Sequence, residues 1–336
     1  MVQFARGTMV ISLDLELAWG RFDTIPVETL SAEATVERMQ IKRLLALMDQ
    51  YEIPATWAVV GHLMLDSCQR DADGDTHPET APHARFSWFP RDWYSCDPCT
   101  TASQSPGWYG PEIVDWIRGA RVRHEIASHS FAHILYGDPE CDAAVTQADL
   151  CAVVETAAQR GIALTSFVFP RNRVGHLELL QRFGFRAYRG VGPPHPLRDG
   201  NVVLRKAVSA LDGLLGFLPS TVRAKEVLPG LWNIPGSYCY LPHEGYGRVV
   251  PVLSRVVKAR NAIKRAIKNG EVYHLWLHPF NLNTRPDLAF RCLERIFSYA
   301  HGMREKGLLD IYTMDEYAQR LGSGKTHAGT TEEIRP

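Results

Sequence analysis

The chain has 336 residues, of which 45% are hydrophobic and 22% charged, and its 37 basic and 37 acidic residues give a formal net charge of zero. This composition is typical of a globular protein with a sizeable core, and the balanced charge excludes a general attraction to nucleic acid or to an anionic membrane. No stretch reaches the roughly 18 apolar residues that span a bilayer, and residues 1–8 do not resemble a secretory signal. The seven cysteines are odd in number and scattered, which argues against a disulfide framework, so a cytoplasmic location is predicted.

Strand-like and helix-like segments alternate along the chain from residue 9 onwards. The predicted elements are strands at 9–15, 55–60, 124–127, 166–169, 187–188, 232–234, 272–277 and 309–312, with helices at 32–51, 111–119, 144–160, 177–183 and 252–268. Such alternation indicates an α/β protein with a parallel sheet, and this many repeats favour closure into a barrel. We therefore predict one catalytic domain over residues 1–320 and a disordered tail over residues 321–336.

A long polar and aromatic segment at residues 66–110 interrupts this alternation. Its large rings are those of Phe86, Trp88, Phe89, Trp93, Tyr94, Trp108 and Tyr109. Two interpretations stay open: a lid or binding loop whose rings contact the apolar faces of sugars, or a loop that packs its rings over the barrel. Its one close cysteine pair, Cys96 and Cys99, has no second pair beside it, so we expect ordinary loop residues.

Two later segments are candidates for contact with a partner. The predicted helix at 252–268 carries six basic residues and no acidic one. A solvated helix face is the preferred interpretation, and contact with phosphate groups of a substrate or at a membrane surface is the alternative. The apolar stretch at 211–219 is expected to pack on the barrel, with contact to a lipid-linked substrate as the alternative.

Two polar motifs follow predicted strands and together suggest a metal site. His129 and His133 are four residues apart after the strand at 124–127. Residues at this spacing share one face of a helical turn, so both imidazoles could bind one ion, although chance alone can produce the spacing. Asp14 and Glu16 alternate at the end of the first strand and therefore lie on one face of it. Two histidines and a carboxylate, with a position left for water, are the ligand set of a hydrolytic zinc site.

Two further strand ends offer residues for acid–base chemistry. Arg171 and Asn172 follow the strand at 166–169, and His278 follows the strand at 272–277. Because active sites of parallel barrels assemble at the carboxyl ends of the strands, we expect these residues to meet the candidate metal ligands. Structural roles are the alternative: helix capping for Arg171 and Asn172, and a buried hydrogen-bonded ring for His278.

Taken together, these motifs occur in an order that resembles the polysaccharide deacetylase (NodB-homology) family over about residues 9–315. The motifs are Asp14-x-Glu16, Ala55-Thr-Trp-Ala-Val-Val-Gly61, His129-Ser-x-x-His133, Phe169-Pro-Arg171, Trp232-x-Ile-Pro235 and His278-Pro279. The resemblance implies a distorted (β/α) barrel with about seven parallel strands and a divalent metal, most often Zn2+. Members of the family hydrolyse N-acetyl or O-acetyl groups on sugars, and some relatives open cyclic amides.

The resemblance also implies a role for each matching residue. Asp14 would be the general base, His278 the general acid, and Arg171 the cation that pairs with the base. The metal ligands would be Glu16, His129 and His133. Glu16 stands one residue further along than the adjacent aspartate of the commonest family pattern, and Arg171 follows the proline that it precedes in many members.

The expected function is removal of an N-acetyl group from a carbohydrate, by metal-activated water, in a cytoplasmic protein. An intracellular glycan precursor or a glycosylated small molecule is the expected substrate. Two alternatives remain open: hydrolysis of a non-sugar or cyclic amide at the same metal site, and an inactive barrel that only binds carbohydrate.

Overall fold

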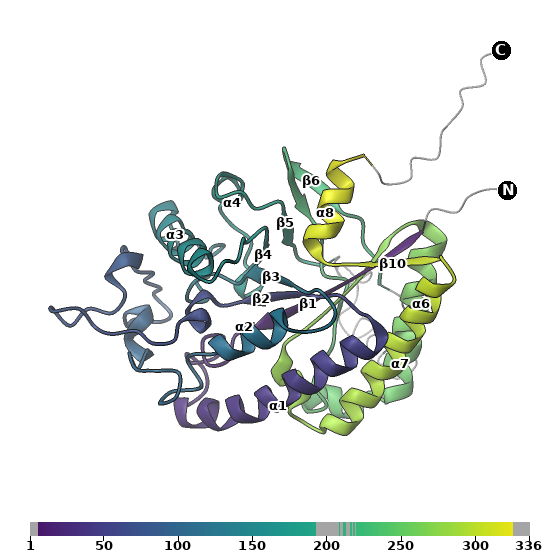
Figure 1. Ribbon diagram of the computed structural model, residues 1–336, viewed down its shortest axis with the longest axis horizontal. Helices are drawn as coiled ribbons and strands as arrows, with labels where there is room; N and C mark the ends of the chain where they lie inside the picture. The colour runs from purple at the N-terminus through teal and green to yellow at the C-terminus, as the bar shows by residue number, and fades with distance from the viewer. Residues whose placement is uncertain are drawn as a thin grey trace, which may run out of the picture.

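The computed structural model describes residues 6–192, 208, 211, 212, 216, 218 and 220–324. Its centre is a strongly curled, mostly parallel sheet that forms a half-barrel (Figure 1). The strands are β1 (Gly7–Leu15), β2 (Thr56–Val59), β3 (Glu125–Ser128), β4 (Ser166–Val168), β5 (Ala187–Arg189), β6 (Lys225–Leu228), β7 (Leu231–Asn233), β8 (Tyr238–Cys239), β9 (Val272–Leu277) and β10 (Leu309–Tyr312). They follow the order β6-β7-β5-β4-β3-β2-β1-β9-β8, and β10 pairs with the first half of β1. Among these pairs only β6 and β7 run antiparallel.

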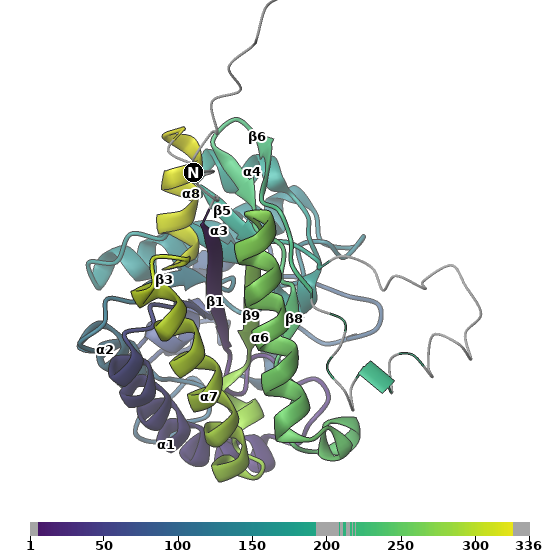
Figure 2. The ribbon, with the colours of Figure 1, turned by 90° about the vertical axis from the view of Figure 1, so that its right-hand side faces the viewer.

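Helices cover the outside of this sheet. The described helices are α1 (Val27–Tyr51), α2 (Pro111–Arg118), α3 (Ala143–Gln159), α4 (Leu177–Arg182), α6 (Val252–Asn269), α7 (Pro286–Glu305) and α8 (Met314–Gly322). In Figure 2, α1, α7 and α6 lie side by side in front of β1 and β9, in agreement with the contacts between them. Every residue of β1 is buried because helices cover one side of it and the curl of the sheet encloses the other.

The concave face of the sheet is filled by a separate apolar cluster. Small and medium residues from successive strands form one cluster on the concave face: Val10, Ala58, Ala127, Val168, Ala187, Ile234 and Val272. Met314 and Ala318 of α8 join this cluster, and the N–H of Met314 donates to Thr56 Oγ1 at the start of β2. The interior is therefore filled near the amino ends of the strands, and the polar residues of β1 face the opposite, carboxyl end.

The predicted fold class is confirmed, and all eight predicted strands are present within two residues of their predicted bounds. The difference lies at the edges, where the short strands β6 and β8 have no clear sequence pattern. α1 begins at Val27, after Pro26, five residues before its predicted start. Helices α7 and α8 were not predicted.

The aromatic segment at 66–110 packs mainly on the body of the protein. Six of its seven large rings are buried, and several meet Trp19 and Phe22, which follow β1. The ring centroids of Trp19 and Trp108 are 5.0 Å apart, as are those of Phe22 and Trp93. Trp88 is the exception at 44% exposure. The packing interpretation therefore describes most of this segment, and Trp88 is the ring that remains accessible to a ligand.

Some predictions fall at or beyond the limits of the described residues. α8 runs to Gly322, two residues into the predicted tail, and residues 325–336 lie outside the described part. Most of the apolar stretch at 211–219 also lies outside it. Among the described helices, none is long and apolar enough to span a membrane. Cys96 and Cys99 are both free cysteines.

Candidate active site

Five of the predicted site residues meet at the carboxyl edge of the sheet. They come from the ends of β1 and β9 and from the loop after β3. Glu16 Oε1 lies 3.1 Å from His129 Nε2, 3.2 Å from His133 Nε2 and 3.4 Å from His278 Nε2. Asp14 Oδ2 lies 3.7 Å from the same nitrogen of His278. The two carboxylates and the rings of His129 and His133 are almost wholly buried, whereas the His278 side chain is 22% exposed and gives solvent access.

The two histidines after β3 do not lie on a helical turn, contrary to the expectation from their spacing. The loop contains no helix, and Ser130 and His133 have positive φ angles of 68° and 60°. Backbone of this kind is sparsely populated by residues other than glycine and needs support from its surroundings. Asp149 of α3 supplies it, because its carboxylate accepts hydrogen bonds from Ser130 Oγ, the N–H groups of Phe131 and Ala132, and the hydroxyl of Tyr136.

The hydrogen bonds of the rings indicate which nitrogen is available. His129 Nδ1 lies 2.7 Å from the carbonyl oxygen of Val168, which can only accept, so Nδ1 carries a proton and Nε2 is the nitrogen that faces Glu16. His133 Nε2 faces the same oxygen. Lone pairs and a carboxylate oxygen that converge in a buried space repel one another unless a cation or protons lie between them. Two imidazole nitrogens and a carboxylate oxygen therefore fit a divalent cation such as zinc.

The arginine that pairs with Asp14 is Arg189, and the predicted pairing with Arg171 is wrong. Arg189 donates from both terminal nitrogens to the two carboxylate oxygens of Asp14, each at 2.6 Å, and from one of them to Ser12 Oγ at 3.1 Å. Both partners are buried, at 1% and 4% exposure. Arg171 instead pairs with Asp23, at 2.6 Å from each carboxylate oxygen.

The curl of the sheet explains this exchange. Arg189 ends β5, which is not adjacent to β1 but faces it across the concave side of the half-barrel. Arg171 lies in a short 3-10 turn after β4 with a φ of 51°, and its side chain lies at the rim. Arg189 directly follows the predicted strand at 187–188, so its place at a strand end could have marked it as a candidate site residue. Its pairing with Asp14 could not be predicted, because local patterns do not tell which strands face each other.

The surroundings shift the pKa values of the acid–base candidates in opposite directions. Burial alone would raise the pKa of Asp14, but the charge and hydrogen bonds of Arg189 outweigh it and lower the pKa. Burial also opposes ionisation of Glu16, yet His278 and His133 bring its pKa well below the ordinary value. Burial alone would lower the pKa of His278, whereas the charge of Glu16 raises it, and the net change is upward. The site therefore favours an ionised Asp14 beside a protonated His278.

Two contacts hold His278 in this position. The backbone N–H of His278 donates to Asn281 Oδ1 at 3.0 Å in the turn that follows β9. Its ring stacks on Phe280, with centroids 4.6 Å apart. These contacts direct Nε2 towards the two carboxylates.

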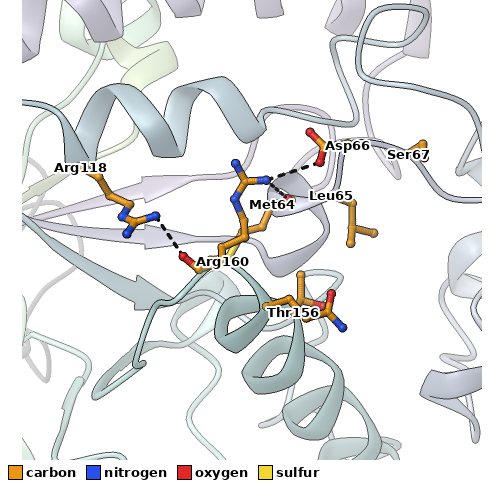
Figure 3. Close-up of a pocket in the computed structure, with 8 residues that line it drawn as sticks. Met64, Leu65, Asp66, Ser67, Arg118, Thr156 and Arg160 are labelled. Atoms are coloured by element: carbon orange, nitrogen blue, oxygen red, sulfur yellow. Dashed lines mark hydrogen bonds and ion pairs between the residues drawn. The ribbon is translucent and has the colours of Figure 1, made fainter.

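A separate surface cavity of about 560 Å³ lies beside α2 and α3 and contains none of these residues (Figure 3). Its guanidinium groups already have partners: Arg160 bonds the carbonyl oxygen of Met64 and pairs with Asp115, and Arg118 donates to the carbonyl oxygen of residue 160. No chemistry comparable with the strand-end cluster lies there.

Comparison with known proteins shows the fold of this chain. No protein-family model matches the sequence, and no curated protein matches it. A structure from Mycobacterium smegmatis assigned to the polysaccharide deacetylases matches with a TM-score of 0.60 and 18% identity, over 97% of this chain and 93% of that one. A second structure so assigned, from Pseudomonas aeruginosa PAO1, matches with a TM-score of 0.60 and 13% identity, over 96% and 93%. The PuuE allantoinase matches with a TM-score of 0.53 and 13% identity, over 98% and 94%.

The chain therefore has the NodB-like fold of polysaccharide deacetylase structures. Its strand ends carry a buried histidine–carboxylate group that could hold a divalent metal. At these identities the likeness concerns the fold, so the chemistry must be argued from the residues themselves.

Proposed function

We propose that this protein is a metal-dependent hydrolase that removes an N-acetyl group from a carbohydrate. The observation that supports this most is the convergence of two imidazole nitrogens on Glu16 Oε1, at 3.1 and 3.2 Å, next to a buried Asp14–Arg189 pair. In this proposal Glu16, His129 and His133 hold the metal. When bound, the metal would polarise the acetamide carbonyl and lower the pKa of a water molecule.

The roles of the other residues follow from their protonation. Asp14 is kept ionised by Arg189 and accepts a proton from the attacking water. His278, with its raised pKa, donates a proton to the departing nitrogen, so that acetate and a free amine are released. Two groups whose surroundings push their pKa values apart are suited to act as base and acid in one reaction.

Trp88 offers a surface for the sugar itself. Its exposed ring stacks on Phe86, with centroids 5.0 Å apart, and its indole N–H donates to Asp138 Oδ2 at 3.2 Å. The guanidinium carbon of Arg171 lies 5.6 Å from the centre of the Trp88 ring. The charge of the same arginine helps to lower the pKa of His133, so Arg171 connects Trp88 with the active site. A fixed aromatic face of this kind suits the apolar face of a pyranose.

The substrate we propose is an intracellular glycan precursor or a glycosylated small molecule, in line with the cytoplasmic location predicted from the sequence. Acetate release from extracellular polymers alone would contradict this part of the proposal. The likeness to an allantoinase keeps a cyclic amide as the second candidate.

The test is a substrate panel in which acetate and total carboxylate are both measured. We expect the wild type to release acetate from an N-acetylated sugar nucleotide or glycoside, and Asp14→Asn to lose at least 100-fold in kcat, the scale of general-base catalysis. Asp315→Asn is the matched control, since it removes a 2.7 Å arginine–aspartate pair at the other end of the sheet. A carboxylate without acetate from a cyclic amide would replace the proposal with the second candidate. No turnover on either class would indicate a binding protein.

A further inference from the structure

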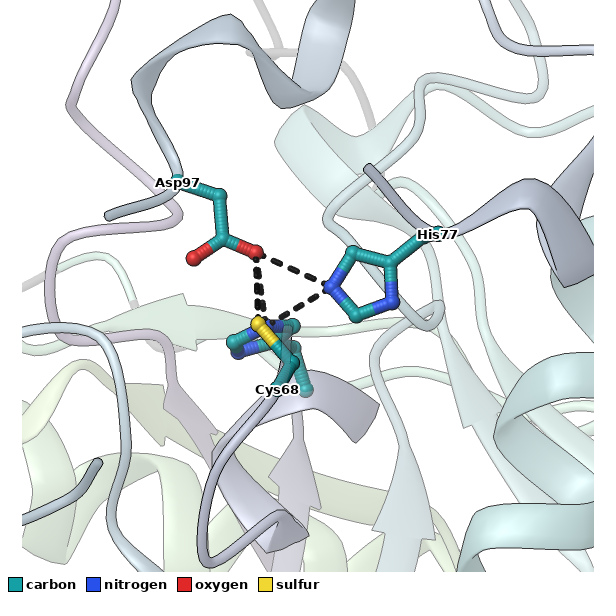
Figure 4. A group of neighbouring side chains, drawn as sticks. Cys68, His77 and Asp97 are labelled. Atoms are coloured by element: carbon teal, nitrogen blue, oxygen red, sulfur yellow. Dashed lines mark hydrogen bonds and ion pairs between the residues drawn. The ribbon is translucent and has the colours of Figure 1, made fainter. Parts of the chain in front are cut away.

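A second group of potential metal ligands lies between the body of the protein and the segment at 66–110. His62 belongs to the turn η1 (Gly61–Met64) after β2, and its partners are Cys68, His77 and Asp97 (Figure 4). Asp97 Oδ2 lies 3.0 Å from His62 Nε2, 2.9 Å from His77 Nε2 and 3.3 Å from Cys68 Sγ. The two Nε2 atoms are 3.1 Å apart.

The outer nitrogens of both rings are already engaged. His62 Nδ1 lies 3.1 Å from the carbonyl oxygen of Trp108, and His77 Nδ1 lies 2.7 Å from Glu79 Oε1. Both partners are acceptors, so each Nδ1 carries a proton and each ring directs Nε2 inwards. Two Nε2 atoms 3.1 Å apart that both face a carboxylate oxygen need either protons or a metal ion between them, and a metal ion would use both of their lone pairs. Two nitrogens bound to a tetrahedral zinc ion at its usual bond length would be about 3.3 Å apart.

We propose that these four side chains bind a structural zinc ion. Two imidazoles, a thiolate and a carboxylate form a complete tetrahedral set, and the sulfur disfavours magnesium and calcium. The thiolate and the carboxylate neutralise the charge of the ion, which makes burial of the site acceptable. The side chains of His62 and Asp97 are fully buried and that of His77 is 4% exposed, so no position is left open for a substrate. The carbonyl of Trp108 and the carboxylate of Glu79 orient the rings from behind, as outer partners of zinc-bound histidines do.

The position of this site gives it a structural purpose. Three of its ligands lie 6, 15 and 35 residues after His62, so one ion would fasten a long irregular segment at several points. The N–H groups of Gly61 and His62 donate to the carbonyl oxygens of Ser130 and Phe131, within the loop that carries the active-site histidines. Zinc at this site would therefore also support that loop.

The full-length protein tests this proposal through its metal content and through cobalt spectroscopy. We expect one zinc equivalent more in the wild type than in Cys68→Ser. When cobalt replaces zinc, the wild type should show a sulfur-to-cobalt charge-transfer band that Cys68→Ser lacks. Cys99→Ser, at a nearby cysteine outside the group, should keep both signals.

Two further variants keep the outcome unambiguous. His77→Gln should also lose one equivalent, which guards against a cysteine variant that fails to fold. His129→Ala/His133→Ala should keep the cobalt–sulfur band, because it removes only ligands of the other site. A folded wild type without the band, or a metal content that is equal in the wild type, Cys68→Ser and His77→Gln, would overturn the proposal and leave a hydrogen-bonded cluster of protonated histidines.

Discussion

Replacement of Arg189 by methionine should change the pH dependence of catalysis. It removes both 2.6 Å hydrogen bonds to Asp14 and leaves a carboxylate of 4% exposure without its paired guanidinium group. An adjacent opposite charge lowers a carboxyl pKa by about 1 to 3 units, and a doubly bonded, buried pair belongs near the upper end of that range. Burial is then opposed mainly by the more distant charge of His278, so the pKa of Asp14 should rise by about 2 to 3 units.

The assay is kcat/KM for acetate release as a function of pH. Activity requires ionised Asp14, so the low-pH limb of the profile should move upwards by the same 2 to 3 units in Arg189→Met, the range expected for loss of such a pair. Arg189→Lys should bring the limb part of the way back, since it restores the charge without the paired bonds. Arg171→Met is the matched control and should leave the limb in place, because its partner is Asp23. Equal loss of activity at every pH, with an unmoved limb, would refute the role of Arg189 in holding Asp14 ionised.

Three further variants test other parts of the account. Burial raises the pKa of Glu125 from 4.5 to about 7, so the folded protein holds a proton that the unfolded chain loses, and stability falls as pH rises between these values. Glu125→Gln should therefore raise the free energy of unfolding at pH 8 by about 3 kcal/mol and change it little at pH 4, as measured by denaturant titration; equal effects at both pH values would contradict this cause. Trp88→Ala should raise KM several-fold with kcat nearly unchanged in steady-state kinetics, and an unchanged KM would remove this ring from the substrate site. Asp149→Asn should weaken metal binding about 10- to 100-fold in a competition titration, which is the usual effect of removing a group that supports metal ligands. An unaltered affinity would mean that the loop of His129 and His133 keeps its shape without this carboxylate.

Local sequence patterns predict most of the strands, because each strand has a recognisable pattern over a few consecutive residues. β1 and β9 are mostly apolar, and the sequence places Asp14 near the end of β1 and His278 directly after β9 at the predicted site. Such patterns record which residues follow a strand, and parallel strands bring those residues to one edge. These patterns therefore predict which residues gather at the site, but they do not predict which of those residues contact one another.

The pairings depend on tertiary geometry that spacing does not encode. Arg189 reaches Asp14 only because the sheet curls β5 round to face β1, and Arg171 is turned away by a left-handed backbone. The spacing of the two active-site histidines suggested a helix, whereas tertiary hydrogen bonds to Asp149 impose an irregular loop. The group around His62 was missed for a related reason: its ligands are spread over 36 residues without a regular interval.

The most direct test of the central claim is the metal content of the purified, zinc-reconstituted protein. His129→Ala/His133→Ala should contain one equivalent less than the wild type. His278→Ala, whose ring contacts Glu16 but is not proposed as a ligand, should keep the wild-type content while losing activity. Equal metal content in the wild type and the folded double variant would contradict the claim that these histidines hold a catalytic metal.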